Sequence, residues 1–149
     1  MTNKPAYQPE GYQSVIPYLH VNGAAKSIAF MKEVFDAQEI AVYPRPDGTV
    51  GHAALRIGDS VIELADAGPE WPAMPCALQV YVPDADAAYQ RALKAGASSL
   101  IEPADQFYGD RTASVRDSSG NNWYIATQKE IVSKEEVDRR LAAMSQLKK

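Results

Sequence analysis

Residues 51–65 form an apolar stretch, GHAALRIGDSVIELA, that contains an imidazole and a carboxylate. His52 and Glu63 are eleven positions apart (63 − 52 = 11), and Arg56 lies between them. Imidazole nitrogens and carboxylate oxygens bind divalent transition metals, and the same pair can act as general acid and base. The stretch therefore has three interpretations: a metal site, half of such a site, or an ordinary hairpin that carries a charge.

The hairpin interpretation makes definite predictions about which side chains share a face. Gly58-Asp59 is typical of a two-residue turn between strands at 50–57 and 60–65. Because side chains alternate along a strand, one face should be apolar and pack against helices, with Leu55, Ile57, Ile62 and Leu64. The opposite face should carry His52, Ala54, Arg56, Val61 and Glu63. A two-residue turn sets Ala54 across from Glu63 and makes His52 its diagonal neighbour.

The elements that must position this hairpin follow from hydrophobic periodicity and turn residues. Strands are predicted at 14–21, 39–44, 50–57, 60–65, 76–82, 98–103, 111–117 and 121–127. Helices are predicted within 22–37, 83–96 and 132–149, with Asp84 as the N-cap of the second and Gly96 as its stop. Val137, Leu141 and Met144 share one side of the last helix.

The element order β-α-β-β-β occurs twice, which indicates an internal repeat. An offset of 61 residues aligns Val21 with Val82 and Glu63 with Tyr124. The predicted fold is α+β, with an N-terminal tail at 1–13, a first βαβββ module at 14–67 and a Pro-rich linker at 68–75. A second module at 76–128 and a C-terminal helix at 129–149 follow. The alternative is a single α+β sandwich whose halves are alike by coincidence.

Strand alternation gathers polar and aromatic residues on the sheet faces that lack helices. These are Tyr18, His20, His52, Arg56, Glu63, Gln79, Tyr81 and Tyr124, and alternation along 111–117 places Ala113 and Val115 on the same face. Such a mixture suits the wall of a small-molecule cavity, although a solvent-exposed sheet face would have the same composition. We therefore treat Tyr18, His20, Arg56, Gln79, Tyr81 and Tyr124 as candidate ligand-binding residues, with Glu63 and His52 as candidate catalytic residues.

Composition excludes several other classes of function. The 149 residues are 46% hydrophobic and 23% charged, with a net charge of −4, which is typical of a soluble globular protein and unsuited to nucleic acid. The polar N-terminal residues MTNKPAYQPEGYQS predict neither a signal peptide nor a membrane span. Cys76 is the single cysteine, so no intramolecular disulfide forms and a reducing cytoplasm is expected. Its apolar neighbours, CALQVYV, favour a packed thiol over a nucleophile.

Residues 14–128 resemble the vicinal oxygen chelate superfamily, which includes glyoxalase I, extradiol dioxygenases and bleomycin- and fosfomycin-resistance proteins. The resemblance depends on the order of four stretches: PYLHVNGAAKSIAFMKEVF, ALRIGDSVIELAD, VYVPDADAAYQRALKAGA and YGDRTASVRDSSGNNWYIAT. The last is most similar to the uncharacterised glyoxalase/bleomycin-resistance-like branch. The resemblance implies paired βαβββ modules that form a curved mixed sheet around a cavity, and frequent homodimers.

Metal-dependent members of that superfamily bind the metal through a His or Gln on the opening strand and a Glu on the final strand of each module. In this chain the four positions correspond to Ile16, Glu63, Ala77 and Tyr124. Glu63 alone keeps a ligand type, so no metal ligand and no cofactor are predicted. A divalent metal would need a shifted register that recruits His20 or His52.

Several roles stay open for individual residues. Glu63 is a general base, a ligand contact or a satisfied structural group, with Arg56 and His52 as partners. His20 and His52 are cavity-wall, surface or catalytic residues. Tyr18, Tyr81 and Tyr124 either stack on a planar ligand or pack across the sheet. By resemblance, Arg111 lies in a loop at the cavity mouth, where it contacts an anionic group or forms an ion pair with Asp110 or Asp117.

Three functions are compatible with these residues. The first is a metal-independent binding protein for a small molecule. The second is a lyase or isomerase of the glyoxalase type, dependent on a metal or on Glu63 and His52, and the third is a dimerisation or regulatory protein. The expected partners are a small molecule and a second copy of the chain, with neither nucleic acid nor membrane.

Overall fold

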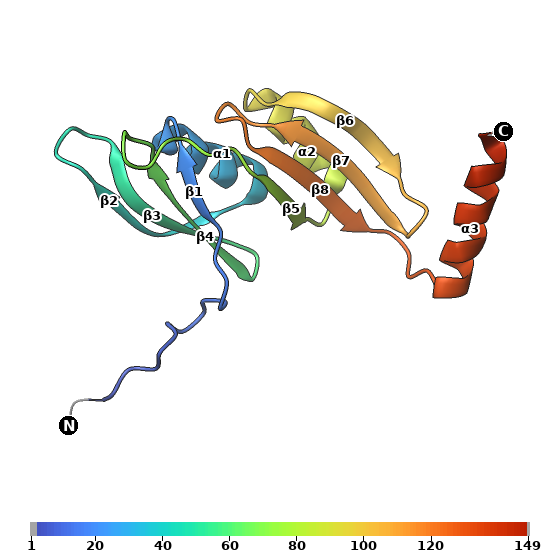
Figure 1. Ribbon diagram of the computed structural model, residues 1–149, viewed down its shortest axis with the longest axis horizontal. Coiled ribbons are helices and arrows are strands. Elements are labelled where there is room, and N and C mark those ends of the chain that lie inside the picture. The colour runs from blue at the N-terminus through green and yellow to red at the C-terminus, as the bar shows by residue number, and fades with distance from the viewer. Residues whose placement is uncertain (1–2, 149) are drawn as a thin grey trace. The chain divides into compact units, whose positions relative to one another are not determined.

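The computed structural model describes residues 3–148 and divides them into two compact units (Figure 1). The first unit extends to Cys76 and includes residues 118–120. The second comprises residues 77–117 and the chain from Asn121 onward. Each unit contains one four-stranded mixed sheet, so the α+β fold with two βαβββ modules is confirmed.

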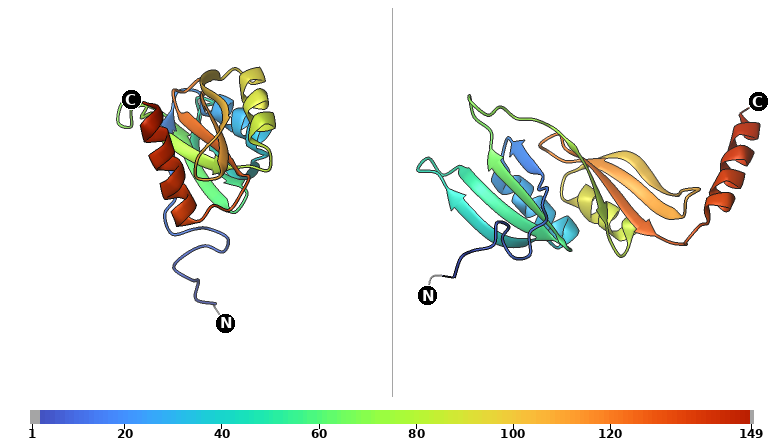
Figure 2. Two further views of the ribbon diagram at one scale, coloured as in Figure 1. Left: turned by 90° about the vertical axis from the view of Figure 1, so that its right-hand side faces the viewer. Right: turned by 60° about the horizontal axis from the view of Figure 1, so that its bottom comes forward.

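The first unit is a sheet with one helix against one of its faces. It contains β1 (Tyr18–Val21), α1 (Ala24–Phe35), β2 (Gln38–Pro44), β3 (Val50–Ile57) and β4 (Ser60–Asp66). The strand order is β1-β4-β3-β2, with β1 parallel to β4 and the other pairs antiparallel. Helix α1 packs on β3 and β4, and it lies against the sheet of its unit in the right-hand view of Figure 2.

The hairpin of β3 and β4 forms as the sequence predicts. Ile57 pairs with Ser60 across the two-residue turn, and Ala54 pairs with Glu63. Leu55, Ile62 and Leu64 are buried on the face toward α1, where they pack with helix residues such as Met31 and Val34. Burying such side chains contributes roughly 1.5–3 kcal/mol each, so this face fixes the register of the hairpin.

In the N-terminal segment, one side chain makes the backbone hydrogen bonds that a longer first strand would have made. The first strand begins at Tyr18, after Pro17, and not at Ser14 as predicted. Beside the vacated positions, the Gln13 carboxamide donates to the Val61 carbonyl at 2.6 Å and accepts from the Val61 amide at 3.0 Å. Gln13 thereby satisfies the backbone groups of β4 that an extended β1 would have paired.

The second unit repeats this plan and adds a terminal helix. It contains β5 (Ala77–Tyr81), α2 (Ala85–Lys94), β6 (Ser98–Asp105), β7 (Asp110–Arg116), β8 (Asn122–Gln128) and α3 (Lys134–Leu147). The strand order is β5-β8-β7-β6, with β5 parallel to β8. Helix α2 packs on its sheet above buried Trp123 and Ile125. Strand β6 extends two residues beyond the predicted end at 103.

The repeat is visible in the strand register. Tyr18 pairs with Glu63 in the first unit, and Gln79 pairs with Tyr124 in the second, so both strands keep the 61-residue offset. The turns at Arg45–Thr49 and Gln106–Asp110 also match: Gly48 and Gly109, at φ +86° and +108°, each donate to the carbonyl three residues earlier. Such positive φ values favour glycine at these two positions.

One set of face assignments is wrong in the second unit. Ala113 and Val115 pair with Ile125 and Trp123, and all four are buried on the helix side. The connection between β7 and β8 has five residues, 117–121, so Ser114 and not Val115 lies opposite Tyr124. A shift of one residue moves every side chain to the other face, and the open face of β7 therefore carries Thr112 and Ser114.

The N-termini of the two module helices are capped by carboxylates from different places. In the second unit, Asp84 is the predicted N-cap of α2, and its side chain accepts from the Ala87 amide at 3.0 Å. In the first unit the equivalent residue is Gly23, which has no capping side chain. There Asp66, at the end of β4, accepts from the amides of Gly23 at 3.1 Å and Ala24 at 2.8 Å.

Helix α3 begins after Ser133, whose hydroxyl accepts from the Glu136 amide at 3.2 Å. None of its described residues is buried, and Leu141 and Met144 are exposed. Hydrogen bonds from Arg139 and Arg140 lower the pKa of Glu136 to about 2. Among residues 3–148, no helix is both long enough and apolar enough to cross a membrane.

Asp66 also accepts from the Val50 amide at 2.7 Å, so one carboxylate serves three backbone donors. We predict that Asp66→Ala lowers the free energy of unfolding by about 2 kcal/mol, because these donors lose their acceptor. Urea unfolding followed by circular dichroism measures this.

The matched control is Thr127→Ala, at the position 61 residues later, where one hydroxyl donates to the Val82 carbonyl at 2.8 Å. This variant should lose about 1 kcal/mol or less. Equal stability losses in the two variants would contradict the assigned role of Asp66.

Candidate functional site

Three polar side chains form a chain on the open face of the first sheet, the face away from α1. Tyr18 and Glu63 are register partners on parallel β1 and β4, and His52 reaches them from β3. The Tyr18 hydroxyl lies 3.2 Å from His52 Nδ1, and His52 Nε2 lies 3.8 Å from Glu63 Oε1. The predicted diagonal approach of His52 to Glu63 is therefore present.

The Tyr18 phenol is affected by its burial and by the charge of this chain. Burial, followed by the negative charge of Glu63, raises the pKa of Tyr18 above its usual value. The phenol oxygen and His52 Nδ1 lie within hydrogen-bond distance, and which of the two donates depends on the tautomer of the imidazole. The side chains of His52 and Glu63 are 35% and 22% exposed, so a bound molecule could reach both.

Arg56 does not lie in this chain, although the sequence analysis treated it as a partner of Glu63. Its Nη1 donates to the Gly11 carbonyl at 2.8 Å, and its guanidinium lies against the N-terminal segment. The neighbour of His52 is instead Tyr43 of β2, whose ring stacks on the imidazole at 6.2 Å. The polar chain is therefore bordered by an aromatic residue on one side and by the N-terminal segment on another.

A pocket of about 410 Å³ opens beside Tyr18 on the same unit. It is lined by Tyr18, His20, Arg45, Gly51, Ala65, Asp66 and Trp71. The predicted ligand residue His20 lies between two aromatic rings: Trp71 stacks on it at 5.7 Å and Tyr18 is tilted against it at 5.2 Å. The volume of this pocket is within the usual range for small-molecule sites, roughly 300–1,000 Å³.

Arg45 and Trp71 were not predicted from the sequence as site residues. Arg45 precedes the Pro-Asp-Gly turn and Trp71 lies in the Pro-rich linker, two segments that were assigned only connecting roles. A large aromatic residue in a linker, 65% exposed here, was the one available signal for Trp71. Nothing in the strand pattern pointed to Arg45.

The open face of the second unit has its own smaller pocket of about 200 Å³. Gln79 and Tyr124 line it, together with Tyr108 and the displaced face residues Thr112 and Ser114. Tyr81 is 61% exposed and donates to Asp110 at 2.8 Å, a hydrogen bond that raises the pKa of Tyr81. The lining of this smaller pocket is uncharged, without the imidazole and carboxylate of the first unit.

Arg111 is held by carboxylates that the sequence analysis did not identify. It forms ion pairs with Asp86 at 2.6 Å and Asp105 at 3.2 Å, and not with Asp110 or Asp117. Its hydrogen bonds lower the pKa of Asp86 and raise its own. With two acidic partners, Arg111 is poorly suited to recognise an anionic ligand.

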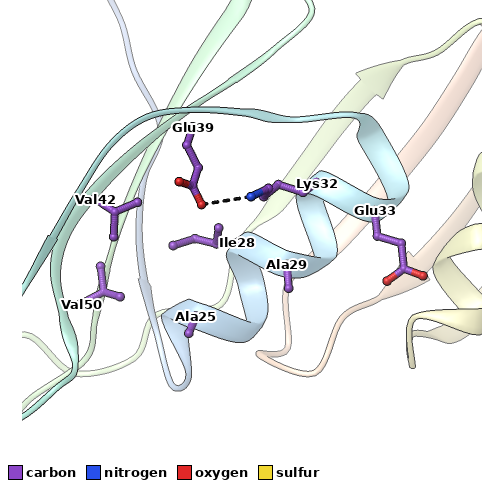
Figure 3. A pocket seen from close by; sticks show the side chains of 8 residues that line it. All are labelled: Ala25, Ile28, Ala29, Lys32, Glu33, Glu39, Val42 and Val50. Carbon is purple, nitrogen blue, oxygen red and sulfur yellow. Dashed lines mark hydrogen bonds and ion pairs between the residues drawn. The ribbon is translucent and has the colours of Figure 1, made fainter.

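A third hollow, of about 680 Å³, lies on the helix side of the first unit (Figure 3). Ile28 of α1, Val42 of β2 and Val50 of β3 form its apolar floor. An ion pair between Lys32 and Glu39, at 3.2 Å, bridges it at one end. It lacks the aromatic and imidazole groups of the open face.

The residues present do not fit a metal of the superfamily type. Among residues 3–148, no group of three or more His, Cys, Asp or Glu side chains could hold an ion. Glu63 and His52 supply two donors, whereas Ile16 and Ala77 have no ligating side-chain atom and Tyr124 has a phenol. A divalent metal site needs three or four protein ligands.

The fold is shared with solved structures of low sequence identity. TioX from Micromonospora sp. ML1 has a TM-score of 0.67 at 22% identity, covering 78% of this chain and 98% of that one. TnmS3, an antibiotic binding protein from Streptomyces sp. CB03234, has a TM-score of 0.61 at 20% identity, covering 79% and 100%. A glyoxalase/bleomycin resistance protein/dioxygenase family enzyme from Burkholderia phytofirmans PsJN has 0.61 at 20% identity, covering 76% and 96%.

Nearer relatives come from mycobacteria. An uncharacterised protein of Mycobacterium bovis is 36% identical over 140 residues, which cover 87% of this chain and 90% of that protein. An uncharacterised protein of Mycobacterium tuberculosis H37Rv has the same identity, over 81% of its length. The family model of the Glyoxalase/Bleomycin resistance protein/Dioxygenase superfamily matches residues 15–125, and the chain therefore belongs to that superfamily.

Proposed function

We propose that this protein binds a small aromatic molecule non-covalently on the open face of its first sheet, without a catalytic metal. The observation that carries the proposal is the Tyr18–His52–Glu63 chain beside an aromatic-lined pocket. A few convergent polar groups among aromatic walls are the usual composition of a ligand site. The antibiotic binding protein TnmS3 shares the fold, which supports binding as the activity.

The proposed anchor of the ligand is the His52–Glu63 pair. Glu63 is partly exposed and, at 3.8 Å, too far from His52 Nε2 for a full hydrogen bond. A ligand hydroxyl or amine could therefore donate to Glu63 without breaking a strong existing bond. Tyr18 and Tyr43 would supply the apolar contact on either side of the imidazole.

The second candidate function is proton-transfer catalysis by a lyase or isomerase of the glyoxalase type. The same chain of phenol, imidazole and carboxylate favours it, because such a chain can hold a proton and move it. Mass spectrometry of the incubated ligand separates the two functions. Unchanged ligand supports binding, whereas a product formed by the wild type and lost in His52→Ala supports catalysis.

Replacement of the anchor carboxylate should weaken ligand binding. In a thermal-shift screen of aromatic antibiotics and hydroxylated aromatic compounds, we expect compounds that stabilise the wild type to lose most of that stabilisation in Glu63→Gln. Isothermal titration should then give about a tenfold weaker affinity, as for one charged hydrogen bond.

The control for this experiment is Glu102→Gln, which removes an exposed carboxylate from β6 of the second unit. It should bind as the wild type does. A ligand whose affinity is the same in Glu63→Gln and in Glu102→Gln would exclude Glu63 as the anchor.

Metal removal should leave binding unchanged. We expect elemental analysis of the purified protein to find far less than one zinc, nickel, manganese or iron per chain, because the donor set holds two suitable ligands. Treatment with EDTA should shift neither the melting temperature nor the ligand affinity. Stoichiometric metal in the wild type that is absent from Glu63→Ala would refute a metal-independent site.

We further propose that the protein is a homodimer in which a second copy covers open-face aromatic residues. Tyr43 and Tyr81 are each more than 60% exposed, and exposed aromatic surface of this kind is typical of interfaces. Light scattering should give about twice the chain mass of 16.2 kDa.

A charge on this face should dissociate the dimer. Tyr43→Asp is expected to shift the mass toward one chain, whereas Tyr7→Asp, at a tyrosine 98% exposed in the N-terminal segment, should not. A monomeric wild type at micromolar concentration would refute the dimer.

A further inference from the structure

We infer that Arg45, His20 and Trp71 form a subsite for the anionic group of a planar aromatic ligand, such as an aromatic carboxylate. The inference rests on the proposed binding function and adds to it the chemical class of the ligand. It concerns the pocket of about 410 Å³ next to Tyr18, whose lining does not include Glu63.

The Arg45 guanidinium is held by neutral hydrogen-bond acceptors. Its Nη1 donates to Thr49 Oγ1 and its Nη2 donates to the Asp66 carbonyl, both at 3.2 Å. Among residues 3–148, no carboxylate lies within ion-pair distance of Arg45. The guanidinium is therefore oriented by neutral oxygens and keeps its full charge for another partner.

Gly51 of β3 leaves space for the Arg45 side chain. A Cβ added to Gly51 would lie 3.1 Å from Arg45 Cγ and 3.4 Å from the Tyr43 carbonyl. The arginine stem thus lies across a glycine of β3, and the small residue lets it lie against the strand. Arg45 is half-buried as a result, whereas a solvated surface arginine would extend away from the sheet.

An aromatic surface lies beside the cation. The Trp71 ring stacks on His20 with an interplanar angle of 10°. Trp71 is nevertheless 65% exposed. An exposed indole next to a pocket offers a stacking surface for a planar ring. His20 Nδ1 is buried and has no hydrogen-bond partner among the described residues, so a ligand oxygen or hydroxyl could supply one.

Three carboxylates near Arg45 have other hydrogen-bond partners or lie outside the pocket. The Asp47 carboxylate accepts from the hydroxyl and amide of Thr49, and these bonds, followed by the charge of Arg45, lower the pKa of Asp47. Asp66 lines the pocket, but its carboxylate accepts from three backbone amides, and only its carbonyl contacts Arg45. Glu63 lies beside His52 and is absent from the lining of this pocket. Arg111 of the second unit differs from Arg45, because its guanidinium forms ion pairs with Asp86 and Asp105.

The test compares two probes that differ in charge, 2-naphthoate and 2-naphthamide, by isothermal titration. The wild type should bind 2-naphthoate about tenfold more tightly, as for one charge-assisted bidentate contact. In Arg45→Gln the two affinities should become equal. Glutamine is the residue at the equivalent turn position of the second unit, Gln106, so the turn accommodates it.

Two further variants separate charge from stacking and from general electrostatics. Trp71→Ala should weaken both probes by the same factor, because it removes the ring surface and leaves the cation. Arg116→Gln, at an exposed arginine of β7, should keep the tenfold preference.

The subsite is refuted if the wild type has no preference, if the preference survives in Arg45→Gln, or if neither probe binds. Each of these results leaves the proposed function to its own test, the loss of ligand stabilisation in Glu63→Gln. Conversely, a preference that depends on Arg45 together with normal binding by Glu63→Gln would support the subsite and refute the anchor.

Discussion

The first unit depends on the hydrogen bonds that the Asp66 carboxylate accepts. It accepts from Gly23 and Ala24 at the start of α1 and from Val50 at the start of β3, while its own backbone ends β4. Three elements are thereby joined at one point by charge-assisted hydrogen bonds. Because its carbonyl also accepts from Arg45, the same residue that joins these elements orients the cation at the pocket wall.

The two units solve one capping problem with opposite arrangements. In the first unit the cap position has Gly23 and the carboxylate comes from the strand, at Asp66. In the second, Asp84 caps its own helix, and Thr127 occupies the strand position, 61 residues after Asp66. In the first unit the backbone carbonyl of Asp66 and the hydroxyl of Thr49, in the neighbouring turn, both accept from Arg45. In the second unit, Gln106 takes that turn position and donates to Thr112 instead.

The sequence predicted those parts of the structure that depend on local pattern. Alternation of Leu55, Ile57, Ile62 and Leu64 determined the hairpin register, and the register in turn placed His52 diagonal to Glu63. It failed where one residue of loop length decides the outcome, as for Ala113 and Val115, since the 117–121 connection is longer than the turn of the first hairpin. It also failed for long side chains such as Arg56, whose partner at Gly11 is 45 residues away.

The asymmetry between the two open faces follows from these local differences. The repeat positions Glu63 and Tyr124 lie at the same register, each beside a residue of the parallel strand, yet one provides a carboxylate and the other a phenol. A metal site that uses both modules needs donors on both, and at the equivalent positions the second module has only the Tyr124 phenol. A charged Glu63 side chain that binds no metal must be partly solvated or paired. The side chain is 22% exposed, and His52 Nε2 lies 3.8 Å from its Oε1. Those conditions also leave the carboxylate accessible from solvent, so a charged group on this face needs no donor from the second module to balance it.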